Sequence, residues 1–598
     1  MAAVWNLSRV SLCLLTAVAS GAAPATPMAA PANRDGAPTP TACEALGFPK
    51  ADHRRDSYSP RGRMVGGAMY APPAMAMPPP PAPPAPPTAP YPATRASPMQ
   101  EMIVTGSVRS AQVMPSPRPG DINTERYPHA QANPIKLTAQ EPVSTFSVDV
   151  DTAAYANVRR FLNDGQSPPR DAVRVEELIN YFDYGYAKPS EAQVPFKPFV
   201  AVTPSPWSAD RQIVHIGLQG YDIPRTQQPP LNLVFLIDTS GSMSDEAKLP
   251  LARKALNLLV DQLRPQDRVS MVAYAGSAGA VLPPTSGREK LKMRCALGAL
   301  ESGGSTAGGQ GLALAYDLAV QNFDPKAVNR VILMTDGDFN VGVADPEKLT
   351  DFVAAKRKTG VYLSVYGLGE GNYNDTLMQA LAQNGNGTAG YIDTLNEARK
   401  SFRDDFSGSL FPIADDVKIQ VEFNPRAVSE YRLIGYETRL LNREDFNNDR
   451  VDAGEVGSGS SVTALYEVTP AGARPSSDPL RYGAPAARAA AGGEIAFLKV
   501  RYKLPGDQAS RLIERPIGAN DTYAQVADAP ESTRWALAVA GFGQKLRGDP
   551  WLSPGFGWKA VGDLAQTARG SDLYGLRAEF VQLARAAGET RTVNESGN

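Results

Sequence analysis

The stretch "NLVFLIDTSGSMSDEAKL", Asn232 to Leu249, joins an uninterrupted aliphatic run to a loop of oxygen-bearing side chains. An aliphatic run without polar alternation predicts a strand that is buried on both faces. Such a strand usually ends in Gly, Asn or Pro, which turn the chain. This one ends in Asp238, Ser240 and Ser242 at alternate positions. The loop therefore predicts part of a site for a hard cation, provided that other loops supply further oxygen atoms.

The surrounding sequence, from Leu231 to about Pro412, repeats the pattern of an aliphatic strand followed by an amphipathic helix. Further strands are predicted at "RVSMVAYA", "NRVILMT" and "VYLSVYGLG", and helices at Lys248–Arg264, Leu312–Gln321 and Pro346–Lys358. Strands that alternate with helices indicate a parallel sheet joined by right-handed crossovers. We therefore predict a doubly wound, Rossmann-like α/β domain.

Strand-rich sequence lies on both sides of this domain. "STFSVDVDT" and "RQIVHIGLQGYDI" precede it, together with the helical segments "AAYANVRRFLNDG" and "DAVRVEELINYF"; "VKIQVEF" and "SSVTALYEV" follow it. Alternating strands need one face covered and their edges paired. We therefore predict that the α/β domain is inserted in, or flanked by, one β-rich module. Three amphipathic helical segments from Ser532 onward close the chain.

The N-terminal region has the composition of a signal peptide followed by a spacer. Arg9, the apolar run Val10 to Ala19 and the small residues up to Ala22 predict a cleaved secretory signal, because the run is too short to span a bilayer. A short buried helix is the alternative. The Pro- and Ala-rich sequence that follows predicts a disordered arm. Within it, "EMIVTGSVRS" (Glu101–Ser110) resembles the leading strand of plug domains in TonB-dependent receptors, or is a fortuitous apolar patch.

The predicted organisation has six parts: a signal peptide (1–22), a disordered Pro/Ala-rich spacer (23–141), an N-terminal α+β flanking segment (142–230), the α/β domain (231–412), a β-rich C-terminal module (413–531) and a helical C-terminal segment (532–598). We expect the mature chain to be exported, to the periplasm or the cell surface, without an integral membrane span.

Composition excludes several functions. A net charge of −2 over 598 residues gives no support for nucleic-acid binding. Three His and three Cys supply neither a disulfide framework nor the usual ligands of zinc or a His-dependent nucleophile. Cys13 lies in the predicted signal peptide, and Cys43 and Cys295 are either free thiols or a pair. The sequence also lacks a P-loop and a G-x-S-x-G motif.

Two further loops can complete the cation site. "ESGGSTAGGQGL" places Thr306 in a Gly-rich turn ahead of a helix, and Asp336-Gly337-Asp338 follows the strand "VILMT". Loops at the carboxyl ends of strands converge in a doubly wound sheet. The predicted metal residues are Asp238, Ser240, Ser242, Thr306 and Asp336, with Asp338 as a supporting or solvent-facing group.

These residues resemble the von Willebrand factor type A domain and its metal-ion-dependent adhesion site, whose pattern is D-x-S-x-S, a distant Thr and an Asp in T-D-G. The resemblance implies that Ser240, Ser242 and Thr306 coordinate Mg²⁺ (or Mn²⁺ or Ca²⁺) directly, while Asp238 and Asp336 act largely through water. Longer stretches such as "VRVEELINYF" and "TDGDFNVG" resemble a bacterial subfamily of exported A-domain proteins. That similarity extends from about Pro142 to the C-terminus.

The function implied is a non-enzymatic, divalent-cation-dependent protein-binding module of the bacterial envelope, completed by an acidic side chain of a partner. The alternatives are a metal-dependent hydrolase that uses the same ion, and a structural envelope scaffold. A second acidic segment, "DFNNDRVDAGEV", starts like an EF-hand loop with Asp445, Asn447 and Asp449 at alternate positions. Arg450 and Val456 stand where that loop needs Gly and Glu, so a solvated turn is favoured over a calcium site.

Overall fold

The computed structural model describes residues 40–48, 124–129, 131–148, 151–337, 346–476 and 493–595. The predicted signal peptide (1–22), the segment Glu101–Ser110 and the side chain of Asp338 lie outside the described residues.

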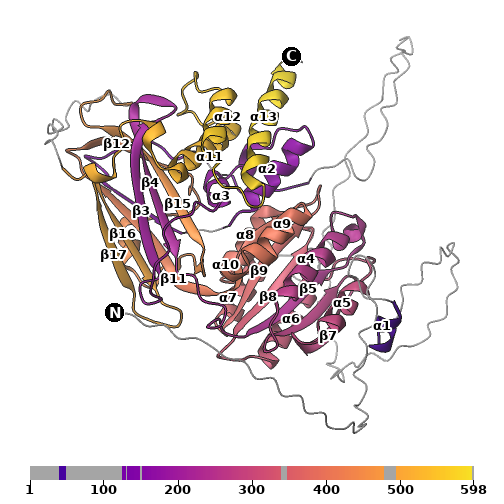
Figure 1. Cartoon of the computed structure of the whole chain (residues 1–598). Helices are drawn as coiled ribbons and strands as arrows, with labels where there is room; N and C mark the ends of the chain where they lie inside the picture. The colour runs from indigo at the N-terminus through magenta and orange to yellow at the C-terminus, as the bar shows by residue number, and fades with distance from the viewer. Residues whose placement is uncertain are drawn as a thin grey trace, which may run out of the picture. The chain divides into compact units, whose positions relative to one another are not determined.

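The α/β domain is built on one sheet of order β10-β9-β8-β5-β6-β7 (Figure 1). Its strands are β5 (Leu231–Asp238), β6 (Arg268–Tyr274), β7 (Ala278–Ser286), β8 (Val328–Thr335), β9 (Val361–Leu368) and β10 (Ala389–Ile392). Neighbouring strands are parallel except β7, which runs antiparallel to β6. The parallel sheet predicted from the aliphatic strands is confirmed for β5, β6, β8, β9 and β10, but β7 is a strand that the sequence pattern did not predict. The connection from β6 to β7 is too short for a crossover helix, so the two strands form a hairpin.

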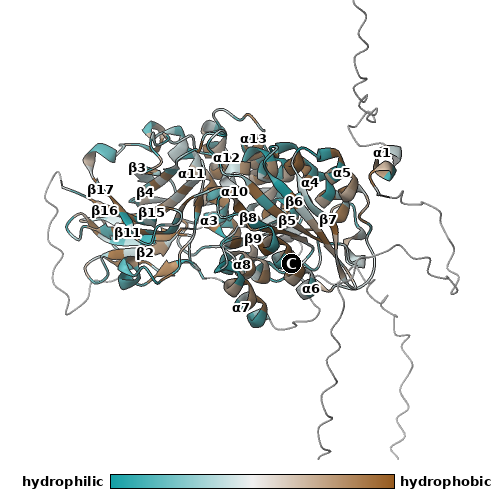
Figure 2. Cartoon of the chain, turned by 90° about the horizontal axis from the view of Figure 1, so that it is seen from below, coloured by the Kyte–Doolittle hydropathy of each residue, from teal (hydrophilic) through white to brown (hydrophobic). Residues whose placement is uncertain are grey.

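Helices cover both faces of this sheet. They are α4 (Leu249–Gln262), α5 (Lys290–Gly298), α6 (Gly308–Gln321), α7 (Pro346–Arg357), α8 (Asp375–Asn384), α9 (Leu395–Arg399) and α10 (Phe406–Leu410). Successive residues of the fully buried β5 point to opposite faces. Leu233 and Phe235 pack in one core with α4 and α5, while Val234 and Leu236 pack in another with α6, α7 and α8. This arrangement confirms the doubly wound fold, and Figure 2 shows the hydrophobic residues along these strands.

The flanking strands form two antiparallel sheets with one core between them. One has the order β1-β12-β15-β4-β3, and the other β13-β2-β11-β16-β17, with β14 paired to β11. Their bounds are β1 (Lys136–Leu137), β2 (Val143–Ser147), β3 (Phe196–Ser205), β4 (Ser208–Gly220), β11 (Pro412–Phe423), β12 (Val428–Ile434), β13 (Leu440–Leu441), β14 (Val456–Gly457), β15 (Ser461–Pro470), β16 (Ala496–Lys503) and β17 (Arg511–Ile517).

Strands from the two sides of the α/β domain pair directly. Phe146 of β2 lies opposite Ile419 of β11, and Val214 of β4 lies opposite Tyr466 of β15. The α/β domain is therefore inserted between strands of one sandwich, as the alternating patterns before and after it predict. Neither half of the flanking sequence can complete these sheets alone.

A helical layer completes the chain: α2 (Ala153–Asn163), α3 (Val175–Asn180), α11 (Glu531–Arg547), α12 (Trp558–Thr567) and α13 (Leu576–Glu595). Tyr155, Phe182, Trp535 and Phe580 share its core, so α2 and the C-terminal helices pack together. The three C-terminal helices occur where the sequence predicts them. No helix in the described ranges is both long and apolar enough to cross a membrane.

Described structure begins well before Pro142, the predicted limit of the spacer. The helix α1 (Pro40–Ala45) is joined to α5 by a disulfide between Cys43 and Cys295, which settles the alternative left open for these cysteines. Farther along, β1 pairs with β12. The prediction that this whole region is spacer was therefore wrong at these points, because short segments gain their order from distant partners and not from their own apolar content.

The EF-hand-like segment forms a turn. Asp445 closes a capping box on the 3₁₀ helix Arg443–Asn447, and Asp449 accepts hydrogen bonds from Arg501 and Ser510. The carboxylates are thus directed to different partners, in agreement with the solvated turn that the sequence favours.

Candidate metal centre

The first loop of the site follows β5. The Asp238 carboxylate is buried, and its Oδ1 accepts a hydrogen bond from the Ser240 backbone N–H at 2.9 Å. This short bond turns the chain back over the strand end, so that the hydroxyl oxygens of Ser240 and Ser242 lie 3.0 Å apart. The D-x-S-x-S spacing thus places one carboxylate and two hydroxyls on one side of the loop.

The other carboxylate oxygen of Asp238 is held by the neighbouring strands. Its Oδ2 accepts hydrogen bonds from the hydroxyls of Tyr274 and Thr335, each at 3.1 Å. Tyr274 ends β6 and Thr335 ends β8, the two strands beside β5. Burial raises the pKa of Asp238 to about 6, so the carboxylate is still charged at neutral pH and gains from a nearby cation.

The third loop supplies Asp336, which is also buried. Lys248 Nζ donates a hydrogen bond to Asp336 Oδ2 at 2.9 Å and another to Asn372 Oδ1 at 3.2 Å. Burial acts to raise the pKa of Asp336, but the Lys248 ammonium and hydrogen bonds with Asn372 and Ser242 hold it below the usual value. The contact between Ser242 and Asp336 joins the first loop to the third.

The residue after Asp336, Gly337, has to be a glycine. Its φ is +105°, and a Cβ there would lie 2.7 Å from both the carbonyl oxygen of Asn372 and the backbone nitrogen of Asn374. A side chain at this position would push the loop that follows β9 away from Asp336.

The second loop lies against the first through its backbone. The Gly241 N–H donates to the Gly304 carbonyl at 3.0 Å, and the Gly303 N–H donates to the Thr239 carbonyl at 2.8 Å. Thr306 follows two residues after Gly304, half-buried and just ahead of α6. The structure thus brings Asp238, Ser240, Ser242 and Asp336 together and places Thr306 on the adjoining loop.

The donor set fits a small hard cation. Mg²⁺ takes six oxygen ligands at 2.0–2.1 Å in octahedral geometry, which separates neighbouring ligands by about 2.9 Å. The 3.0 Å between the Ser240 and Ser242 hydroxyls matches two such adjacent positions. Within the described ranges, no group of three or more His, Cys, Asp or Glu is placed to hold a metal ion. A cation bound beside Asp238 and Asp336 would therefore take hydroxyl oxygens among its ligands.

Sequence reasoning missed Lys248, Asn372 and Tyr274. Lys248 belongs to the stretch that defines the site, but a lysine near a helix start carries no signal of its own. Asn372 and Tyr274 follow other strands, and only the folded sheet shows that they reach the carboxylates of Asp336 and Asp238.

Buried ion pairs connect the domain to the flanking helices. Arg174 beside α3 donates to Asp375 Oδ2 at 2.5 Å, at the start of α8 and three residues after Asn372. Arg159 of α2 donates to Glu397 at 2.8 Å and to Glu579 of α13 at 3.1 Å. Both arginines are almost fully buried. The contact between Arg174 and Asp375 anchors the start of α8, directly after the loop that carries Asn372.

The site residues are separate from three cavities of the described structure. The cavities, of about 830, 320 and 180 Å³, are lined by residues other than the five predicted metal residues. Catalytic sites usually occupy a concave pocket. The cavity of about 830 Å³ instead lies between Glu125–Tyr127 and helices α7 and α8.

Comparisons with known proteins agree with this architecture. The profile of the von Willebrand factor type A domain matches residues 232–404, and a second von Willebrand factor profile matches residues 121–215. The profile described as "Uncharacterized protein YfbK, C-terminal" matches residues 408–590. The uncharacterized protein YfbK of Escherichia coli K12 is 45% identical over 474 residues, which cover 78% of this chain and 81% of that protein.

The chain belongs to the YfbK family of bacterial von Willebrand factor type A domain proteins. Human inter-alpha-trypsin inhibitor heavy chain H4 is 29% identical to this YfbK-family chain over 214 residues, 34% of this chain and 22% of the human protein. A von Willebrand factor type A structure from Catenulispora acidiphila is 18% identical, covers 65% of this chain and 89% of its own, and has a TM-score of 0.37. Von Willebrand factor type A domains typically bind a divalent cation at this kind of site and mediate protein–protein interactions.

Proposed function

We propose that this YfbK-family protein is a non-enzymatic, divalent-cation-dependent binding module of the bacterial envelope that engages an acidic side chain of a protein partner. The observation that carries the proposal is the pair of hydroxyls of Ser240 and Ser242, 3.0 Å apart and beside the buried carboxylates of Asp238 and Asp336.

The site residues would have different roles in holding the cation. Ser240, Ser242 and Thr306 would hold Mg²⁺ directly, and Asp238 and Asp336 would support it largely through water. Tyr274 and Thr335 fix the orientation of the Asp238 carboxylate. When bound, the ion supplies an electrophilic position that a partner carboxylate can fill, because neutral hydroxyls compensate little of its charge.

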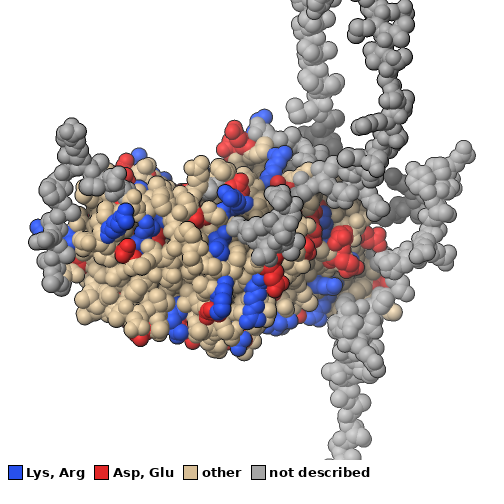
Figure 3. Space-filling model, turned by 90° about the horizontal axis from the view of Figure 1, so that it is seen from above, with Lys and Arg blue, Asp and Glu red and all other residues tan. Residues whose placement is uncertain are grey.

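The two alternatives, a metal-dependent hydrolase and a structural scaffold, are supported less well by the contacts of the site. A hydrolase needs a general base close to the ion, whereas the carboxylates of Asp238 and Asp336 already accept hydrogen bonds from fixed partners. A purely structural scaffold does not require the two hydroxyls to match adjacent octahedral positions. Figure 3 shows Lys and Arg lying among Asp and Glu on the face that it draws, which favours a protein partner over nucleic acid.

We propose that the protein acts after export, in the periplasm or at the cell surface. The apolar run before Ala22 supports this, as does the disulfide between Cys43 and Cys295, because disulfides persist mainly in oxidising compartments.

The test compares Ser242→Ala with Ser244→Ala, which removes an exposed hydroxyl from the same short turn. Immobilised protein should capture a partner from an envelope extract in Mg²⁺ and release it in chelator. We expect Ser242→Ala to lose at least about 10-fold in capture and Ser244→Ala to keep it. Normal capture by Ser242→Ala in excess chelator would refute the proposal.

A further inference from the structure

Lys248 contacts residues of the proposed metal site, although it does not belong to the five-residue metal-binding pattern. Its ammonium contacts Asp336 Oδ2 at 2.9 Å and Asn372 Oδ1 at 3.2 Å. The side chain of Lys248 is only 11% exposed and that of Asp336 is 0% exposed. A surface ion pair with these partners would exchange freely with solvent, whereas this one is enclosed.

The side chain of Lys248 packs against Gly369, which has no side chain to obstruct it. Gly369, which follows β9, has a φ of +70°, and a Cβ there would lie 2.3 to 2.8 Å from three side-chain carbons of Lys248. A glycine is thus required both by the backbone and by the close approach of the lysine. The aliphatic part of Lys248 crosses the end of β9, and this path leads its ammonium to Asp336.

This placement changes the charge of the site. By formal charge, the two carboxylates of Asp238 and Asp336 and the ammonium of Lys248, which pairs with Asp336, sum to one negative charge. Loading a divalent cation then leaves one positive charge, which a single partner carboxylate neutralises. Without Lys248 the loaded site would already be neutral. Charges in a partly buried site interact more strongly than in bulk water, so this difference in charge changes the affinities for the cation and for the carboxylate.

We infer that Lys248 sets the balance of this site: it weakens binding of the divalent cation and strengthens binding of a carboxylate to the loaded site. The inference rests on the proposed function and adds a positioning and specificity-determining residue to it. Lys248 therefore makes the loaded site anion-selective, at the expense of metal affinity.

The first experiment measures the affinity for Mn²⁺, which occupies oxygen sites of this kind, by the loss of the free Mn²⁺ signal in electron paramagnetic resonance. We expect Lys248→Met, which keeps the aliphatic path over Gly369, to bind Mn²⁺ about 10-fold more tightly than the wild type. Lys248→Arg retains the charge and should stay within about 3-fold of the wild type. The matched control is Lys254→Met, which removes an exposed ammonium from the same helix and should change nothing.

The second experiment measures acetate binding to the Mn²⁺-loaded protein, by the relaxation enhancement of ¹³C-acetate. Here Lys248→Met should bind acetate at least about 3-fold more weakly than the wild type, the opposite sign to the metal effect. A variant that has merely lost structure would weaken both ligands. Unchanged or weaker Mn²⁺ binding by Lys248→Met, an equal effect of Lys254→Met, or unaltered acetate binding would overturn the inference.

The two proposals fail separately. If the wild type does not bind Mn²⁺, or Ser242→Ala binds it equally well, the proposed metal site itself is wrong. If binding depends on Ser242 but is indifferent to the charge of residue 248, only the role of Lys248 is wrong.

Discussion

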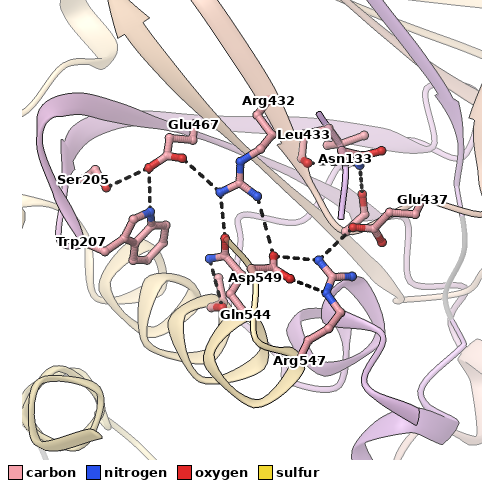
Figure 4. A network of polar contacts seen from close by, with 12 residues as sticks. Asn133, Ser205, Trp207, Arg432, Leu433, Glu437, Glu467, Gln544, Arg547 and Asp549 are labelled. Atoms are coloured by element: carbon pink, nitrogen blue, oxygen red, sulfur yellow. Dashed lines mark hydrogen bonds and ion pairs between the residues drawn. The ribbon is translucent and has the colours of Figure 1, made fainter. Parts of the chain in front are cut away.

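Two of the regions that hold buried charges in this protein are arranged in opposite ways. At the ends of β5 and β8, the carboxylates of Asp238 and Asp336 are buried, and the ammonium of Lys248 pairs with Asp336. Between the β-sandwich and helix α11, the Arg432 guanidinium donates to Glu467 at 3.0 Å and to Gln544 at 2.8 Å (Figure 4).

The second region is internally neutral. Arg547 pairs with Asp549 at 2.6 Å and with Glu437 at 2.9 Å, and Glu467 also accepts from Trp207 Nε1 at 2.7 Å and pairs with Arg211 at 3.0 Å. Three guanidinium groups thus face three carboxylates.

The difference separates a structural network from a binding site. In the network around Arg432, each buried carboxylate meets a guanidinium, so the charges fix one packing of α11 on the sandwich. In the proposed metal site, two buried carboxylates face one ammonium beside clustered hydroxyls, so a bound cation would neutralise the remaining negative charge. Substitutions in the first region should change stability, and substitutions in the second should change binding.

The largest expected effect is that of Arg432→Met. It leaves Glu467 and Asp549 buried with fewer partners, and removing one member of a buried ion pair typically costs about 3–5 kcal/mol of unfolding free energy. Urea unfolding followed by tryptophan fluorescence measures this, because Trp207 is buried in the same contact. A loss below about 1 kcal/mol would show that the network is dispensable. Metal affinity should stay within about 2-fold of the wild type.

Metal binding should stabilise the protein by a smaller amount. At a free Mg²⁺ concentration 100 times its Kd, the unfolding free energy should rise by about 2.7 kcal/mol. Ser240→Ala should abolish this increase while leaving the unfolding free energy in chelator within about 1 kcal/mol of the wild type. If Ser240→Ala were instead as destabilising as Arg432→Met, the distinction between the two regions would fail.

His215 provides a pH-dependent test of the same sandwich–helix contact. Its Nδ1 lies 3.0 Å from Thr533 Oγ1 of α11, and its Nε2 lies 2.7 Å from the Tyr186 hydroxyl. Burial lowers the pKa of His215 to about 3, against about 6.5 in the unfolded chain. Its contribution to stability is therefore complete above pH 6.5 and is lost as the pH falls toward 3, because the unfolded state takes up a proton that the folded state refuses.

Between pH 7 and pH 5 this histidine should account for about 2 kcal/mol of the fall in unfolding free energy. His215→Gln cannot titrate and should remove that part of the pH dependence, whatever its effect on stability at pH 7. Denaturation curves of both proteins at several pH values measure the difference. Parallel pH profiles would mean that His215 has the same pKa in the folded and unfolded states.

The smallest effect is expected where an ion pair is exposed. Lys559 and Asp563 lie 2.6 Å apart on the surface of α12, and the lysine side chain is 87% exposed. Lys559→Met should change the unfolding free energy by less than about 0.5 kcal/mol. The same urea titration serves as the control for Arg432→Met, and a loss of several kcal/mol here would show that charge removal alone, without burial, is destabilising.

The sequence by itself determined the α/β domain and the positions of its site loops. The aliphatic run of β5 requires burial on both faces, and a parallel sheet brings the ends of β5 and β8 to one edge. The pattern of strands in the sequence is therefore enough to predict that the loop with Asp238, Ser240 and Ser242 meets Asp336. Their metal-binding role stays a prediction until a cation is measured there.

Only the tertiary structure decided which distant groups meet. The disulfide joins Cys43 to Cys295 across 252 positions, and the Arg432 network needs α11 to pack on the sandwich. Lys248 reaches Asp336 only because Gly369, at the end of another strand, leaves room for its side chain. Periodicity reports which face of an element is buried, but not which side chain of another element lies opposite. That choice depends on strand order, register and rotamer, which are fixed only when the whole chain packs.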